Sequence, residues 1–225
     1  MSLSSNRPRE IGDYIIHYKN RLGKGSFGEV FLAENTEDAS VYAVKILKYD
    51  KENKDIEREK RCLEKTAEIS HPNIMRLYYW EEKQGDLYLF LQLCDLTLRD
   101  WLNQRGKCSE NEALFYFEQI INGLSRLHEL GLIHRDLKPD NIFLKSDQIL
   151  LGDFGLSIEA NFTASIVGTP LYMDPRLLEK QYFENHMMVY DQTVDIWSAG
   201  IILYEMITGE HPFDRNSSTT DRNKF

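Results

Sequence analysis

Apolar and polar residues alternate through the first third of the chain, as they do in half-buried β-strands. The stretches YIIHYKNRLG, EVFLAEN and VYAVKIL, between residues 14 and 47, are rich in Val, Ile, Tyr and Phe, and turn residues separate them. Residues 71–93 predict two further strands around a turn at QGD. The charged stretch 50–70 lacks Gly and Pro and predicts a helix. We therefore expect a small β-rich unit with one main helix, preceded by a loose polar lead-in, residues 1–13.

The pattern then changes to helical spacing. Ser109 and Glu112 form a capping-box pattern, and Gly131 is a helix-stopping residue. Between them, apolar residues recur at helical intervals: Leu114, Phe117, Ile121 and Leu124. Residues 193–209, TVDIWSAGIILYEMITG, are apolar almost all round and predict a buried helix.

Composition and charge narrow the class of protein. The 225 residues are 42% hydrophobic and 28% charged, which is typical of a globular protein with a core. A net charge of -9 argues against a nucleic-acid-binding surface over the whole molecule. We expect no secretory signal and no membrane insertion, because the N-terminus lacks an apolar run and the longest apolar stretch contains Glu205. The three cysteines show no metal-ligand spacing and indicate a cytoplasmic protein, or alternatively a nuclear one.

The segment GKGSFGEV carries the first candidate chemistry, with Gly23, Gly25 and Gly28 in a G-x-G-x-x-G arrangement. Alone, this pattern fits a dinucleotide fingerprint or simply a flexible turn. A dinucleotide fingerprint opens a helix, whereas here a predicted strand follows. We therefore expect the tip of a hairpin, where glycines let backbone N–H groups approach phosphates closely.

Three further motifs carry charged groups. In VYAVKIL, Ala43 and Lys45 share a strand face, so a flat ring has room beside a cation that can reach phosphates. GLIHRDLKPDNIFL places Asp136, Lys138 and Asn141 within six positions, and LLGDFGL adds Asp153. Taken singly, each motif also has a simpler interpretation. Lys45 fits a solvated strand lysine, the stretch around Asp136 fits a hydrogen-bonded surface loop, and the stretch around Asp153 fits a turn.

The order of these motifs resembles that of the eukaryotic protein kinases over roughly residues 14–213. The resemblance implies an α+β, bilobal fold: a β-rich N-lobe over residues 14–91, then a hinge and a mainly helical C-lobe over 92–225. It implies transfer of the γ-phosphate of ATP, with Mg²⁺, to a Ser or Thr hydroxyl of a protein substrate. The alternative is a non-catalytic kinase-like module that binds nucleotide or partners. The oligomeric state is left open.

The resemblance also implies a role for each residue. Asp136 would accept the proton of the substrate hydroxyl, and Lys138 would balance charge on the transferring phosphoryl group. Asn141 and Asp153 would hold the magnesium ions. Lys45 would bind the α- and β-phosphates and pair with a helix glutamate. We take Glu59 as that glutamate, with Glu57 and Glu64 as rivals. Adenine would contact residues of both lobes and the connection between them: Val30 and Ala43 above, Phe143 below, Leu91 as gatekeeper on the edge strand, and the backbone of Gln92 and Cys94.

Two further expectations concern the segment after Asp153. The Thr169 hydroxyl would bond Asp136 and Lys138, while Thr163 and Ser165 are candidates for phosphorylation.

The chain departs from the family pattern in three places. It has MDPR where the family has Ala-Pro-Glu, so Arg176 replaces the glutamate. Residues 183–190 resemble a short insertion, and we expect the C-lobe to lack its last helices. The stretch LFLQLCDLTLRDWLNQR is similar to the stress-responsive translation-initiation-factor kinases, but the long insert that those kinases often carry is missing, so the subfamily stays open.

Overall fold

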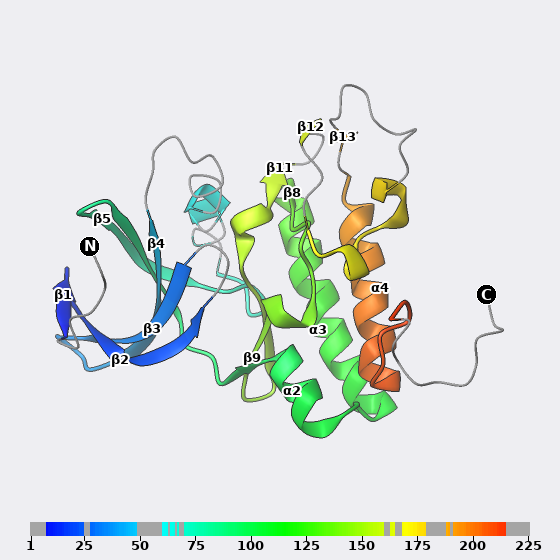
Figure 1. Cartoon of the computed structure of the whole chain (residues 1–225), viewed down its shortest axis with the longest axis horizontal. Coiled ribbons are helices and arrows are strands. Elements are labelled where there is room, and N and C mark those ends of the chain that lie inside the picture. Colours follow the sequence, from blue (N-terminus) through cyan, green and yellow to red (C-terminus); the bar gives the residue numbers. More distant parts are fainter. Residues whose placement is uncertain are drawn as a thin grey trace.

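The computed structural model describes residues 8–24, 28–48, 60–62, 64–65, 67, 70–159, 163–164, 168–178, 188–189 and 191–214. These residues form two lobes. A curled β-sheet makes up the first lobe, at the left of Figure 1, and the helices α2, α3 and α4 lie in the second.

The first lobe is a six-stranded antiparallel sheet with the strand order β1-β2-β3-β4-β6-β5. The strands are β1 (Arg9–Ile11), β2 (Tyr14–Lys24), β3 (Gly28–Asn35), β4 (Val41–Lys48), β5 (Leu77–Lys83) and β6 (Asp86–Gln92). The predicted strands are therefore confirmed. The expectation that Leu91 lies on an edge strand is wrong, because β6 is paired on both sides, with β4 and with β5.

The sheet begins earlier than predicted. We expected residues 1–13 to be a loose lead-in, but Arg9–Ile11 pairs with β2, and Ile11 is fully buried. Ile11 packs on the outer face of the sheet with Tyr14 and Phe90, whose rings stack at 4.1 Å. Its burial stabilises the fold by roughly 1.5–3 kcal/mol. One apolar residue among polar neighbours gives no alternation, and so the sequence did not reveal this strand.

Helical residues lie where the charged stretch predicts a helix, at positions 60–62, 64–65 and 67. Lys60 connects these helical residues to the sheet through contacts with two residues of β5. Its Nζ lies 3.5 Å from the ring centre of Trp80 and 2.9 Å from Oε1 of Glu82. Glu59 and Glu57 lie outside the described residues.

The second lobe contains three described helices and several short strands. Its helices are α2 (Leu98–Arg105), α3 (Glu110–Glu129) and α4 (Thr193–Thr208). Its strands are β7 (Leu96–Thr97), β8 (Leu132–Ile133), β9 (Ile142–Lys145), β10 (Gln148–Leu151), β11 (Ile158–Glu159), β12 (Thr163–Ala164) and β13 (Met188–Val189). Short 3-10 helices occupy Pro139–Asn141, Phe154–Leu156, Pro170–Tyr172 and Pro175–Leu178. β9 pairs with both β7 and β10, while β8 pairs with β11 and β12 with β13.

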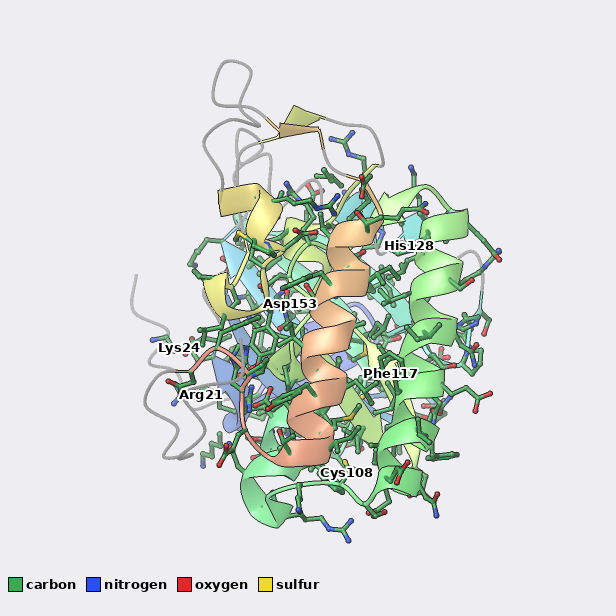
Figure 2. All side chains as sticks on the ribbon, turned by 90° about the vertical axis from the view of Figure 1, so that its right-hand side faces the viewer. Arg21, Lys24, Cys108, Phe117, His128 and Asp153 are labelled. Carbon is green, nitrogen blue, oxygen red and sulfur yellow. The ribbon has the colours of Figure 1, made fainter. Side chains whose placement is uncertain are left out.

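Helix α3 begins and ends where predicted but buries a different face. The Ser109–Glu112 capping box is present, and Gly131 has a φ of +70° just beyond the helix. Leu114, however, is 52% exposed. The prediction for Leu124 is confirmed, since it is buried, but most other buried positions lie one residue before a predicted one; the buried residues are Ala113, Tyr116, Ile120, Gly123, Leu124 and Leu127. The need for a small residue determines which face of α3 is buried, since a Cβ on Gly123 would stand 2.7 Å from the carbonyl oxygen of Asn73. Phe117 is labelled in Figure 2.

Helix α4 was expected to be buried all round, and this is only partly correct. Ala199, Ile202 and Met206 are fully buried, but Ile196 is 51% exposed and Tyr204 46% exposed within the part of the chain that the structure describes. Among these described residues, no helix has the length and apolar character needed to cross a bilayer.

Two apolar clusters cover the two faces of the sheet. The larger one runs from Leu47, Leu87 and Leu89 in the sheet into the helical lobe, reaching Ile120 on α3 and Ile202 on α4. The smaller one closes the outer face, around β1 and β2. Because one core joins both lobes, the loops between them are held at a defined place.

Candidate active site

Asp136 lies at the centre of a hydrogen-bonded cluster in the loop after β8. Its Oδ2 accepts from Lys138 Nζ and from Asn141 Nδ2, both at 2.9 Å. Its Oδ1 accepts from the Thr169 hydroxyl at 2.7 Å, and that hydroxyl accepts from Lys138 Nζ at 2.7 Å. The expected contacts of Thr169 with Asp136 and Lys138 are thus confirmed. Both oxygens of the carboxylate are fixed in direction.

A buried carboxylate on α4 holds this loop from behind. Asp195 is fully buried, and its two oxygens accept the backbone N–H groups of His134 and Arg135, each at 2.9 Å. The His128 ring, at the end of α3, lies 2.9 Å from the same carboxylate and beside the start of α4 in Figure 2. Arg135 has a φ of +65°, which a non-glycine residue adopts only under such constraint.

A second contact joins the loop to the segment that carries Asp153. His134 Nε2 lies 3.0 Å from the carbonyl oxygen of Gly152, and the His134 ring packs against Phe154. Asp153 itself has left-handed backbone angles, φ 58° and ψ 68°. The next residue, Phe154, is fully buried.

Lys45 and Asp153 form an ion pair that joins the two lobes. Lys45 lies on β4 and is only 9% exposed, and its Nζ is 2.8 Å from Asp153 Oδ1. Burial by itself would raise the pKa of Asp153. The ammonium of Lys45, with weaker help from His134 and Lys138, reverses this effect and holds the pKa below its ordinary value. Asp153 is therefore ionised at neutral pH. Glu59, the expected partner of Lys45, lies outside the described residues.

The glycine motif spans a hairpin, as predicted, because β2 and β3 pair on either side of it. Gly28 is required by space, since a Cβ there would stand 2.1 Å from the carbonyl oxygen of Ile46 on β4. Gly23 has no atom within 4 Å of such a Cβ, so open space lies beside it. Gly25 lies outside the described residues.

The residues expected around adenine lie on adjoining strands of the two lobes. Val30 pairs with Lys45, and Ala43 pairs with Leu91. Phe143 comes from β9 in the other lobe, and a Cβ on Gly152 would stand 2.9 Å from its ring. The ring of Phe143 therefore lies directly beside the residue that precedes Asp153.

The connection between the lobes begins at the end of β6. The Gln92 N–H donates to the carbonyl oxygen of Arg76 at 3.0 Å, and the Cys94 thiol lies 3.7 Å from the carbonyl oxygen of Gln92. Burial raises the pKa of Cys94 to about 12. Cys94 is partly buried against the apolar core, and its thiol is a poor nucleophile because it stays protonated.

The donor set fits magnesium. Asp153 offers an ionised carboxylate. The Asn141 side chain makes its two described hydrogen bonds through Nδ2, which leaves the Oδ1 of Asn141 as an oxygen ligand for a metal ion. Mg²⁺ prefers oxygen ligands and is usually held by one or two carboxylates together with substrate phosphates. Among the described residues, no group of three or more His, Cys, Asp or Glu side chains could hold a metal ion. Asn141 and Asp153 would thus hold the ion with help from a phosphate-bearing ligand.

The sequence did not indicate two parts of this arrangement. One is Asp195. The hint of its role in the sequence is that an acidic residue stands within an otherwise apolar helix. The other is a buried network beside the site. Arg99 Nη1 lies 2.5 Å from Glu205 Oε1, and Arg99 Nη2 donates to the Tyr172 hydroxyl, also at 2.5 Å. That hydroxyl donates to Glu205 Oε2 at 2.6 Å. The burial of Tyr172 and its bond to Glu205 raise its pKa. Glu205, like Asp195, is an acidic residue within the otherwise apolar helix α4.

Comparison with known proteins gives a consistent result. The sequence model described as "Protein kinase domain" matches residues 16–225. Serine/threonine-protein kinase Sgk1 of Fundulus heteroclitus is 40% identical over 227 aligned positions, which cover 96% of this chain and 50% of that protein. The proteins of the same name from Danio rerio and Homo sapiens are each 39% identical, with the same coverage. The chain spans about half the length of these curated relatives.

Proposed function

This chain belongs to the protein kinase family, and we propose that it is an ATP-dependent serine/threonine kinase that phosphorylates a protein substrate. The resemblance read from the order of the motifs is confirmed, and so is the bilobal α+β fold. The observation that carries the proposal is the arrangement around Asp136, in which Lys138, Asn141 and Thr169 fix both carboxylate oxygens.

Asp136 would orient the substrate hydroxyl and accept its proton. The hydroxyl oxygen attacks the γ-phosphorus of ATP, the bond from that phosphorus to the bridging oxygen breaks, and ADP leaves. Such a transfer depends mainly on positioning and on charge neutralisation. A carboxylate whose two oxygens are already held needs little rearrangement when the substrate arrives.

Lys138 would neutralise charge on the transferring group, because its ammonium lies 2.9 Å from Asp136. Lys45 would hold the α- and β-phosphates from the opposite lobe. Its bond to Asp153 supports this role, because it brings the cation to the residue that would bind magnesium. Asn141 and Asp153 would hold Mg²⁺, which would supply charge neutralisation at the phosphates when bound.

The substrate class follows from the family and from Lys138, a residue that favours Ser/Thr over Tyr substrates by resemblance. The relatives named above carry the serine/threonine designation in their names. We further propose a cytoplasmic location, with the nucleus as the alternative.

A transfer assay tests the proposal. The chain is incubated with ATP labelled in the γ-phosphate and a set of Ser- and Thr-containing peptides, and label in the peptides is measured. Asp136→Asn should lower transfer by roughly a hundredfold or more while nucleotide affinity stays within about threefold. Asp153→Asn should instead weaken magnesium-dependent nucleotide binding. Asp147→Asn, in an exposed turn of the same lobe, is the matched control and should change neither quantity.

Two results would overturn this assignment. Nucleotide binding by the wild-type chain without any transfer would favour the non-catalytic module. Equal losses of nucleotide affinity in the Asp136 and Asp153 variants would contradict the division of roles between them.

A further inference from the structure

Asp174 and Arg176 form an ion pair in the segment that follows Thr169. Both belong to the MDPR motif, which departs from the family pattern. The guanidinium of Arg176 turns back onto Asp174, with Nε at 3.1 Å from Oδ1 and Nη2 at 2.6 Å from Oδ2. The backbone N–H of Arg176 also donates to Asp174 Oδ1, at 2.9 Å. One carboxylate therefore receives both the side chain and the main chain of the residue two positions later.

Asp174 is much more deeply buried than Arg176, and its carboxylate therefore depends on the arginine. The Asp174 side chain is 5% exposed, whereas that of Arg176 is 48% exposed. A carboxylate in this position is costly to bury without a cation and donors. Burial would raise the pKa of Asp174, but its bonds to Arg176 lower the pKa below the ordinary value. Asp174 therefore stays ionised and needs Arg176.

The pair is also attached to helix α4. Arg176 Nη2 donates to the hydroxyl of Thr193, the first residue of α4, at 2.5 Å. The Thr193 hydroxyl in turn donates to Asp191. One turn further along the helix, the Ser198 hydroxyl donates to the carbonyl oxygen of Tyr172 at 2.7 Å. The Tyr172 hydroxyl also donates to Glu205 on the same helix, so the segment 168–178 is bound to α4 at three places.

The other end of this segment reaches the candidate active site. Thr169 contacts Asp136 and Lys138, and the short 3-10 helix Pro170–Tyr172 lies between Thr169 and Asp174. Leu171, in that helix, is 47% exposed. Asp174 therefore lies five residues along the chain from the hydroxyl that fixes Asp136.

We propose that Asp174 and Arg176 are positioning residues, which lock segment 168–178 to the start of α4 and so present Thr169 and Leu171 correctly to Asp136 and to the protein substrate. The ion pair of the motif and its bond to Thr193 form an anchor between the segment and α4. This inference rests on the proposed kinase function for its catalytic consequence, but the anchor itself can be measured without turnover.

The test is a double-mutant cycle of Asp174→Ala, Arg176→Ala and the combined variant. Arg176→Ala should lower kcat/KM for the peptide roughly ten- to a hundredfold, through kcat because Thr169 loses its place beside Asp136 and through KM because Leu171 shifts, with nucleotide affinity within about twofold. The combined variant should lose less than the product of the two single losses, because the unpaired buried carboxylate is gone. Amide hydrogen exchange in 168–178 should be faster in Arg176→Ala and unchanged in α3.

Arg126→Ala is the matched control, since Arg126 forms an exposed ion pair with Glu129 on α3. Should Arg176→Ala fail to fold, Arg176→Lys keeps the charge without the two-pronged contact and should lose about three- to tenfold. The proposal is overturned if Arg176→Ala, or Arg176→Lys in its place, matches Arg126→Ala in both activity and exchange, or if the single losses simply multiply. If the wild-type chain transfers no phosphate, the proposed function fails, and the exchange comparison alone decides about the anchor.

Discussion

The Thr169 hydroxyl offers the sharpest test of how the candidate active site is held, because an isosteric change removes it. Thr169→Val keeps the shape of the side chain but deletes the oxygen that lies 2.7 Å from Asp136 Oδ1 and 2.7 Å from Lys138 Nζ. Hydrogen bonds to charged groups contribute about 1.5–3 kcal/mol each. Asp136 keeps two donors on its other oxygen, and Lys138 keeps Asp136, so we expect only one such loss in total. This amounts to a fall in kcat of about 10- to 150-fold.

Steady-state kinetics at saturating peptide and a titration of bound nucleotide measure the two sides of this prediction. Nucleotide affinity should change by less than about twofold, because Asp136 and Lys138, which Thr169 contacts, would act on the substrate hydroxyl and the transferring phosphoryl group. Thr169→Ser keeps the hydroxyl and should retain at least a third of the turnover. The reasoning is refuted if Thr169→Val keeps a third of wild-type kcat, or if Ser and Val at this position behave alike.

Three other predictions follow from the same structure. Lys45→Met should reduce turnover roughly a hundred- to a thousandfold while circular dichroism shows the fold intact; a variant that keeps over a tenth of the turnover would contradict the phosphate role. Asp195→Asn should lower the free energy of unfolding by about 3 kcal/mol or more in a denaturant titration, because the amide presents a donor to a backbone N–H; a loss under about 1 kcal/mol would be incompatible with its contacts. The pKa of Asp153 lies below its ordinary value of 3.8, so its ion pair with Lys45 stabilises the fold at neutral pH and is lost as the pH falls through the lowered pKa. The stability difference between wild type and Asp153→Asn should therefore shrink below about pH 4, and a constant difference down to pH 2 would count against the pairing.

Local patterns predicted most of the elements and the central residues of the site. The strand that contains Ala43 and Lys45 has strong β-formers, and the Ser109–Glu112 box marks the start of α3. Asp136, Lys138 and Asn141 lie in one short loop, so their spacing alone brings them together. Such signals are contained within a few residues, and the chain has little freedom to contradict them.

Contacts between distant segments were not predictable in the same way. The buried face of α3 depends on which residue is small enough to meet Asn73 and Leu151, and periodicity alone does not reveal this. The first strand depends on a single residue, Ile11, filling a space on the outer face of the sheet. The capping box of α2, formed by Thr97 and Asp100, was visible in the sequence and was not recognised.

Helix α4 carries three buried polar side chains, and each bonds a different segment of the lobe. Asp195 holds the loop of Asp136, Ser198 holds the backbone of Tyr172, and Glu205 holds the side chain of Arg99. A helix rises 1.5 Å per residue, so these attachment points stand at fixed intervals along a rod of about 15 Å. The groups that would align a hydroxyl thus share one rigid frame, whereas Lys45 belongs to the sheet. A change at Lys45 would therefore leave the alignment of the groups around Asp136 unchanged.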